Sequence, residues 1–93
     1  MPRVKVVVTA PLAMHMGGQR EVEVEAGTVR EVIGQLVERF GAELKNRLLD
    51  DSGRLRRFVN LYVNDSYVDP EEDRRLSEGD EVLILPAVSG GTA

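Results

Sequence analysis

The residues of this chain whose types and spacing could do chemistry lie near its C-terminus, where Val82–Gly91 reads VLILPAVSGG. Gly90 and Gly91 have no Cβ atom, so their backbone can enter a narrow channel and adopt φ values that other residues avoid. The apolar run before them has the length of a buried strand, which would give the tail a rigid starting point. We therefore interpret the tail as a means of delivering a terminal carboxylate into the active site of another protein.

A carboxylate is a poor electrophile, so its conversion to a thiocarboxylate or an amide requires activation, most naturally adenylation by ATP. The chain contains no cysteine, which excludes disulfides, thiolate metal sites, iron–sulfur clusters and cysteine nucleophiles. Any sulfur that this protein carries would therefore be bound to its C-terminal carboxyl group.

No side-chain constellation in the sequence predicts an enzyme active site or a bound cofactor. His15 is the single histidine, and no carboxylate or nucleophile is evident beside it in the sequence. Gly17 and Gly18 are not followed by a helix start or a lysine, so they predict a turn rather than a phosphate-binding loop. The carboxylates between residues 65 and 81 lack the alternating ligand pattern of a calcium loop. We therefore expect a protein that is not an enzyme.

Charge is distributed unevenly along the chain. Residues 1–64 contain ten Lys/Arg and eight Asp/Glu, a net of +2, whereas residues 65–81 contain two and eight, a net of −6. This acidic stretch is either a solvated connection or a docking face that attracts basic partners. The overall net charge of −4 argues against a nucleic-acid partner. No apolar run approaches the ~18 residues of a membrane span, and no secretory signal is evident, so we expect no membrane partner and a cytoplasmic location.

Alternation of apolar and polar residues predicts strands at residues 3–9, 20–25 and 58–63, with a short edge strand at Tyr67-Val68. The first two are expected to form a hairpin with a long loop. An unbroken apolar run, Val82–Leu85, predicts a last strand that is buried on both faces and lies centrally in the sheet.

One amphipathic helix is the clearest element of the sequence. Thr28 and Glu31 have the spacing of a capping box at its start, and Gly41 stands where a C-terminal capping glycine belongs. A short helix or turn is expected at residues 42–49. The apolar stripe of the main helix, spaced to lie on a sheet, consists of Val29, Val32, Ile33, Leu36, Val37 and Phe40.

The order of elements, ββ, helix, β, short β, β, predicts an α+β protein of the β-grasp (ubiquitin-like) type. We expect a mixed sheet of four to five strands with one main helix packed on one face. Ninety-three residues suit a single core. Residues 1–87 are expected to form the domain and residues 88–93 a flexible tail, because we expect the tail after the last strand to make no contacts with the core.

Two segments, FVNLYVND at 58–65 and LSEGDEVLILPAVSGG at 76–91, resemble the ThiS/MoaD family of ubiquitin-like sulfur carriers, and within it the CysO type. The start of the chain is similar too, with a strand, a loop ending in Gly17-Gly18-Gln19, a charged strand and the helix after Thr28. This resemblance implies adenylation of Gly91 by a ubiquitin-activating-type enzyme and its conversion to a thiocarboxylate. It also implies a cysteine-synthase-like enzyme that accepts the sulfur for cysteine or related biosynthesis.

The chain departs from the family pattern at its end, where Thr92 and Ala93 follow the paired glycines. Family members that react directly end at the second glycine. The resemblance therefore implies that cleavage between Gly91 and Thr92 comes first, as in relatives whose short extension is cut by a JAMM-type zinc metalloprotease. The other interpretation is that the two residues are an expression artefact or mark an inactive chain.

Three other functions stay open at this stage. The chain is similar to the small subunit of molybdopterin synthase, although that subunit resembles a form ending at Gly-Gly. A ubiquitin-like modifier, attached through Gly91 to lysines of other proteins, would use the same adenylation chemistry. A binding module would use no tail chemistry at all.

Overall fold

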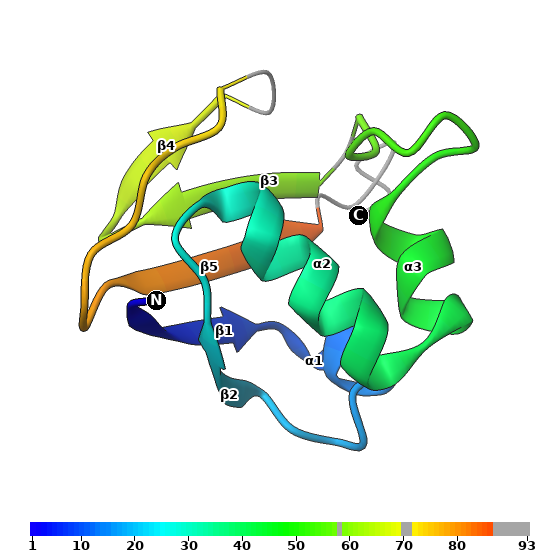
Figure 1. Cartoon of the computed structure of the whole chain (residues 1–93). Coiled ribbons are helices and arrows are strands. Elements are labelled where there is room, and N and C mark those ends of the chain that lie inside the picture. Colours follow the sequence, from blue (N-terminus) through cyan, green and yellow to red (C-terminus); the bar gives the residue numbers. More distant parts are fainter. Residues whose placement is uncertain (58, 70–71, 87–93) are drawn as a thin grey trace.

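The computed structural model describes residues 1–57, 59–69 and 72–86, which form a mixed sheet with the longest helix across one face (Figure 1). The sheet has five strands in the order β2-β1-β5-β3-β4. This arrangement confirms the predicted α+β architecture with the last strand at the centre. Within the described residues, no helix is long and apolar enough to span a membrane. The elements are β1 (Arg3–Val8), α1 (Ala10–Ala13), β2 (Glu21–Glu25), α2 (Val29–Phe40), α3 (Ala42–Leu48), β3 (Val59–Val63), β4 (Ser66–Val68) and β5 (Glu81–Pro86).

Strand pairing follows the predicted order. β1 and β2 pair antiparallel as a hairpin, with Val4 opposite Val24. β5 runs parallel to β1 on one side and antiparallel to β3 on the other, and β4 pairs with the far side of β3. Because two parallel strands cannot be joined by a tight turn, the chain between β1 and β5 crosses over the sheet, and α2 lies on that crossover (Figure 1).

Helix α2 begins and ends at the predicted residues. The Thr28 hydroxyl accepts a hydrogen bond from the Glu31 N–H (3.3 Å), and the Glu31 carboxylate accepts one from the Gly27 N–H (2.6 Å). These bonds satisfy N–H groups that have no partner inside the helix. At the other end, Gly41 has a φ of 92° and donates its N–H to the Val37 carbonyl (2.8 Å). Both capping predictions are confirmed.

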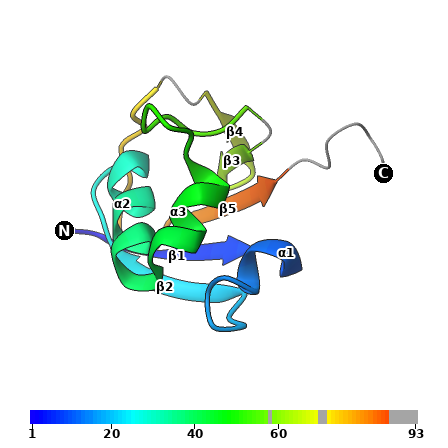
Figure 2. The same ribbon diagram turned by 90° about the vertical axis from the view of Figure 1, so that its right-hand side faces the viewer.

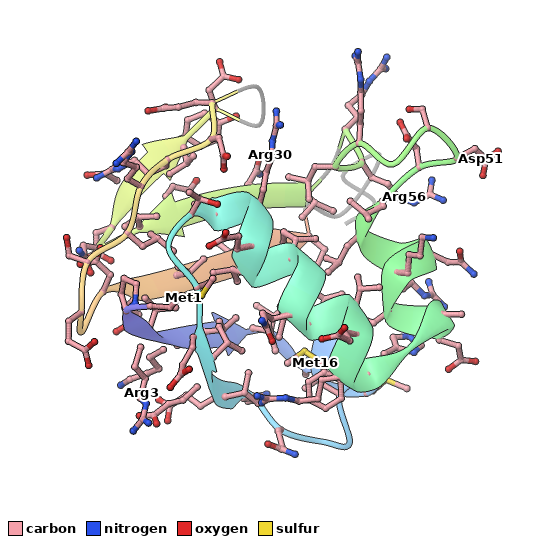
Figure 3. All side chains as sticks on the ribbon, viewed as in Figure 1. Met1, Arg3, Met16, Arg30, Asp51 and Arg56 are labelled. Carbon is pink, nitrogen blue, oxygen red and sulfur yellow. The ribbon has the colours of Figure 1, made fainter. Side chains whose placement is uncertain are left out.

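The core lies between the sheet and the helices. Leu36 of α2 is fully buried, whereas Val37 and Phe40, at the end of the predicted stripe, are partly buried against the core. Met16, from the loop after α1, is also fully buried and lies near the C-terminal half of α2 (Figure 3). The short helix expected after Gly41 is present as α3. Other fully buried side chains are Val6, Leu44, Leu48, Val82 and Ile84.

One prediction about the strands is wrong, and the loop after β1 contains a helix that was not predicted. Leu83 and Leu85 of β5 are only half-buried, because the helices of the described chain pack on the other face of the sheet; β5 is therefore buried on one face and not on both. The loop after β1 contains α1, which follows Thr9 and has Pro11 in its first turn. Proline's fixed φ suits the first turn of a helix as well as the end of a strand. Phe58, the predicted start of the third strand, lies outside the described residues.

Side chains tie the β3–β4 turn to the start of β5. Asn64 and Asp65 have left-handed φ values of 48° and 72°, as a tight hairpin turn requires. The Asn64 amide accepts a hydrogen bond from the Glu81 N–H (3.0 Å) and donates one to Asp80 (2.9 Å). The Asp80 carboxylate also accepts from the Ser77 N–H (2.8 Å), which closes the predicted turn before β5. The Ser77 bond and then the Asn64 bond hold the pKa of Asp80 below its ordinary value.

Replacing Leu36 with alanine should lower the free energy of unfolding by about 2–5 kcal/mol, because it leaves a cavity beneath α2. Urea unfolding followed by circular dichroism measures this loss. Glu38→Ala, at an exposed position of the same helix, is the control and should change stability by less than about 0.5 kcal/mol. A loss below ~1 kcal/mol for Leu36→Ala would contradict the assignment of the buried face.

Replacing Asp80 with asparagine should destabilise the protein more at pH 7 than at pH 3. The folded-state pKa of Asp80 is depressed, so its carboxylate contributes stability above the unfolded pKa of about 3.9. That contribution is lost as the pH falls through the folded pKa. Urea unfolding at pH 7, 5 and 3 measures the difference, with Asp65→Asn, at an exposed turn position, as the control. A difference that does not vary with pH would show that the Asp80 charge is irrelevant.

Candidate functional site

The candidate site begins at the end of β5, which is held on both sides. Val8 of β1 is the last partner on the parallel side, opposite Ile84. On the antiparallel side the pairing continues further, to Val59 opposite Pro86. Ile84 is completely buried. The central strand is therefore fixed by two neighbours and by the core up to Ile84, and by β3 alone from there to Pro86.

Pro86 is compatible with this position because the β1 pairing has already ended. Proline has no N–H to donate to a ladder, so it occurs at strand ends and edges rather than within a central strand. The chain leaves the sheet beside Val59. The predicted site residues Gly90, Gly91 and Thr92 follow within six residues of Pro86 and lie outside the described residues.

The strand end is flanked by α1 and by the loop that precedes β3 (Figure 2). The Val59 N–H donates to the Arg56 carbonyl (3.0 Å), which places the exposed Arg56 and Arg57 next to the strand end. Asp50 shapes this loop: its carboxylate accepts hydrogen bonds from the Ser52 hydroxyl (2.7 Å) and N–H (2.9 Å) and from the Arg54 N–H (3.0 Å). These bonds, that from the Ser52 hydroxyl first, lower the pKa of Asp50.

The two ends of β5 differ in charge. Residues 42–57 contain five Lys/Arg and three Asp/Glu, a net of +2, and lie at the end from which the tail leaves. The last part of the acidic stretch, residues 77–81, lies at the opposite end, where the Gly79 N–H bonds to the Arg3 carbonyl. Two of its carboxylates, Glu78 and Asp80, accept backbone hydrogen bonds within the chain. Its docking role stays a prediction, and its position favours the alternative of a connecting segment.

A histidine–glutamate pair near the strand end could not be seen in the sequence. His15 Nδ1 lies 3.4 Å from Glu43 Oε1, although 28 residues separate them. The pair lines a shallow hollow of about 570 Å³ together with Asn46, Arg47 and Arg56. These five residues include no serine or threonine that could act as a nucleophile. Within residues 1–57, 59–69 and 72–86, no group of three His, Cys, Asp or Glu could hold a metal ion.

The uncovered face of the sheet carries a row of half-buried apolar and aromatic side chains. Val7 lies opposite Leu83, Leu83 opposite Tyr62, and Tyr62 opposite Tyr67. The rings of Tyr62 and Tyr67 meet edge to face, with centroids 5.8 Å apart, and Tyr67 is 55% exposed. The alternation of residues along the strands could have indicated this row. In β5, however, residues on both faces are apolar, so the sequence did not show that Leu83 faces outward.

Comparison with known proteins shows one consistent relationship. Residues 6–91 match the ThiS family model, which ends at Gly91 and leaves Thr92 and Ala93 unmatched. The chain is 41% identical over 98 aligned residues to the sulfur carrier protein CysO of Mycobacterium tuberculosis. That alignment covers 95% of this chain and 98% of the relative.

Solved structures agree with this relationship. A chain of the Amycolatopsis orientalis BexX/CysO complex superposes with a TM-score of 0.80 at 38% identity, covering 95% of this chain and 99% of that one. The small archaeal modifier protein SAMP1 of Haloferax volcanii superposes with a TM-score of 0.83 at 28% identity, covering 96% and 99%. These similarities confirm the β-grasp fold.

Proposed function

This chain belongs to the ThiS family, and on that premise we propose that it is a sulfur carrier whose reactive group is the carboxylate of Gly91. The end of the family match at Gly91 carries this proposal. Gly91 is the fifth residue after Pro86, the end of the anchored strand. Five extended residues span at most about 16–18 Å, which lets the carboxylate enter a partner's active site while the domain stays outside it.

Activation proceeds in two balanced steps on a partner enzyme of the ubiquitin-activating type. The Gly91 carboxylate attacks the α-phosphorus of ATP and expels pyrophosphate, which leaves an acyl adenylate. A sulfide donor then attacks the acyl carbon and expels AMP, which leaves the thiocarboxylate. The chain supplies only the backbone of Gly90 and Gly91, whose lack of side chains suits a narrow channel.

The sulfur acceptor that we propose is a cysteine-synthase-like enzyme. A thiocarboxylate sulfur is nucleophilic and can attack an activated amino-acid substrate, forming a carbon–sulfur bond and expelling the substrate's leaving group. Water then hydrolyses the acyl–sulfur bond, which releases the thiol product and regenerates the Gly91 carboxylate. The relative from M. tuberculosis is named a sulfur carrier protein, in agreement with this role. The carrier contributes no catalytic side chain to these steps. Because its activation needs ATP and a reduced sulfur donor, we propose that it acts in the cytoplasm.

Removal of Thr92 and Ala93 precedes this chemistry. Thr92 is β-branched and Ala93 has a Cβ atom, so neither fits a channel shaped for paired glycines. We assign the cleavage after Gly91 to a zinc metalloprotease of the JAMM type. The processed chain then ends at the residue where the family match ends.

A second function, protein modification, is favoured by the similarity to the small archaeal modifier protein SAMP1. The acyl adenylate of Gly91 would react with a lysine amine instead of sulfide, expelling AMP and forming an amide. Both functions use the same terminus and the same activating step. They differ only in the nucleophile that the partner presents. No feature of the described residues favours the molybdopterin synthase subunit over either.

A chain ending at Gly91 should form a thiocarboxylate when it is incubated with its activating enzyme, ATP and sulfide. Intact-mass spectrometry detects the exchange of one oxygen for sulfur. The full-length chain should stay unmodified until a metalloprotease removes Thr92 and Ala93, because the side chains of these two residues are too wide for the channel.

Gly91→Val in the truncated chain should abolish the reaction and leave the melting temperature unchanged, since Gly91 lies beyond the anchored strand. Equal modification of the full-length and truncated chains would contradict the processing step. A lysine amide in place of the thiocarboxylate would favour the modifier function.

A further inference from the structure

A groove on the helix side of the molecule shares Arg57 with the surroundings of the strand end. It lies between α2 and the loop between α3 and β3, and its volume is about 910 Å³. Its floor is apolar and includes Ile33, Val37, Leu49, Leu55 and Leu61. Val37, Leu49 and Leu55 are only partly buried. The groove is therefore an accessible apolar surface within a size range that ligands and peptide side chains occupy.

Gly34 lies in the wall of this groove, in the middle of α2. It is exposed, and a Cβ atom built on it would meet no atom within 4 Å. Glycine is a poor residue for a helix interior, where alanine is markedly more favourable. No contact inside the described chain requires a glycine here. Its effect is to keep the wall of the groove open to an approaching molecule.

Three arginines surround the groove: Arg30 from the first turn of α2, and Arg54 and Arg57 from the facing loop. Figure 3 shows Arg30 projecting outward from the helix. The salt bridges of the described residues involve none of these three side chains. Of the two carboxylates at the groove, Asp50 is already hydrogen-bonded to its own loop, and the other is Glu72. The rim is therefore a net positive surface beside an apolar floor.

The dimensions indicate the form of the occupant. The α2 residues that line the groove run from Val29 to Val37, eight steps of about 1.5 Å, or about 12 Å. An extended chain covers that length with about four residues at ~3.3 Å each. We propose that this groove binds an extended segment of a partner protein, with apolar side chains on the floor and carboxylates beside the arginines, a pattern in which arginine clusters recognise acidic motifs.

The test uses the full-length ¹⁵N-labelled chain and an acetylated, amidated hexapeptide of sequence DLVIEE. Saturable shifts are expected in the amide signals of Gly34 and Leu55. The neutral peptide NLVIQQ should bind at least tenfold more weakly. Added salt should weaken the binding of the acidic peptide and leave the binding of the neutral one unchanged. Absence of saturable shifts at the groove, or equal binding of the two peptides, would overturn the proposal.

Variants separate binding from folding. Gly34→Ala should raise the melting temperature by about 4–8 °C because alanine favours the helix, yet weaken peptide binding severalfold because its methyl group enters the groove. Gly34→Leu should weaken binding more than tenfold. Unchanged binding by Gly34→Leu would overturn the proposal.

Charge reversal gives a matched comparison. The double variant Arg54→Glu, Arg57→Glu should weaken binding of DLVIEE more than tenfold and of NLVIQQ little. The double variant Lys45→Glu, Arg47→Glu makes the same change in net charge at two exposed residues of α3 that do not line the groove, and it should leave both affinities unchanged. Equal loss of affinity in this control and in the arginine variant would show that only overall charge matters, which contradicts a site at this rim.

Discussion

The two-sided pairing of β5 is the interaction on which the rest of this structure depends. β5 lies between the β1–β2 hairpin and the β3–β4 hairpin, so without it the two hairpins could not form a single sheet. Its parallel pairing with β1 requires a crossover, and α2 on that crossover covers one face and completes the core. The same pairing holds Pro86 against Val59, which fixes where the tail starts. Folding and the proposed delivery of the terminus therefore share one strand.

Much of the fold could be predicted because local signals agreed with tertiary structure. The capping residues Thr28 and Gly41 and the stripe containing Leu36 determined α2, and the apolar run of β5 indicated a central strand. The second face of β5 could not be predicted in the same way. Leu83 and Leu85 are as apolar as their buried neighbours, and only the absence of a helix from that face in the described structure leaves them half-exposed.

The candidate site could be predicted only where its residues are neighbours in the sequence. Paired glycines after a buried strand can be recognised in one segment, whereas the pair of His15 and Glu43 joins residues far apart in the chain. The groove beside Gly34 likewise needs α2 and the loop before β3 to face each other. In the sequence Gly34 is only an unfavourable helix residue. The charge contrast between the two ends of β5 also follows from topology, because the sheet places the acidic turn at 77–81 and the basic segment at 42–57 at opposite ends of that strand.

In the function proposed above, the anchored strand and the short tail together set the reach of the terminus. The most direct measurement compares a chain ending at Gly91 with one carrying two extra serines between Val88 and Ser89. Both should have the same melting temperature, because the insertion lies beyond the anchored strand. We expect adenylation of the longer chain to be at least tenfold slower, measured as pyrophosphate released with the matched activating enzyme. Equal rates would contradict the proposal, since the distance from β5 to Gly91 would then be unimportant.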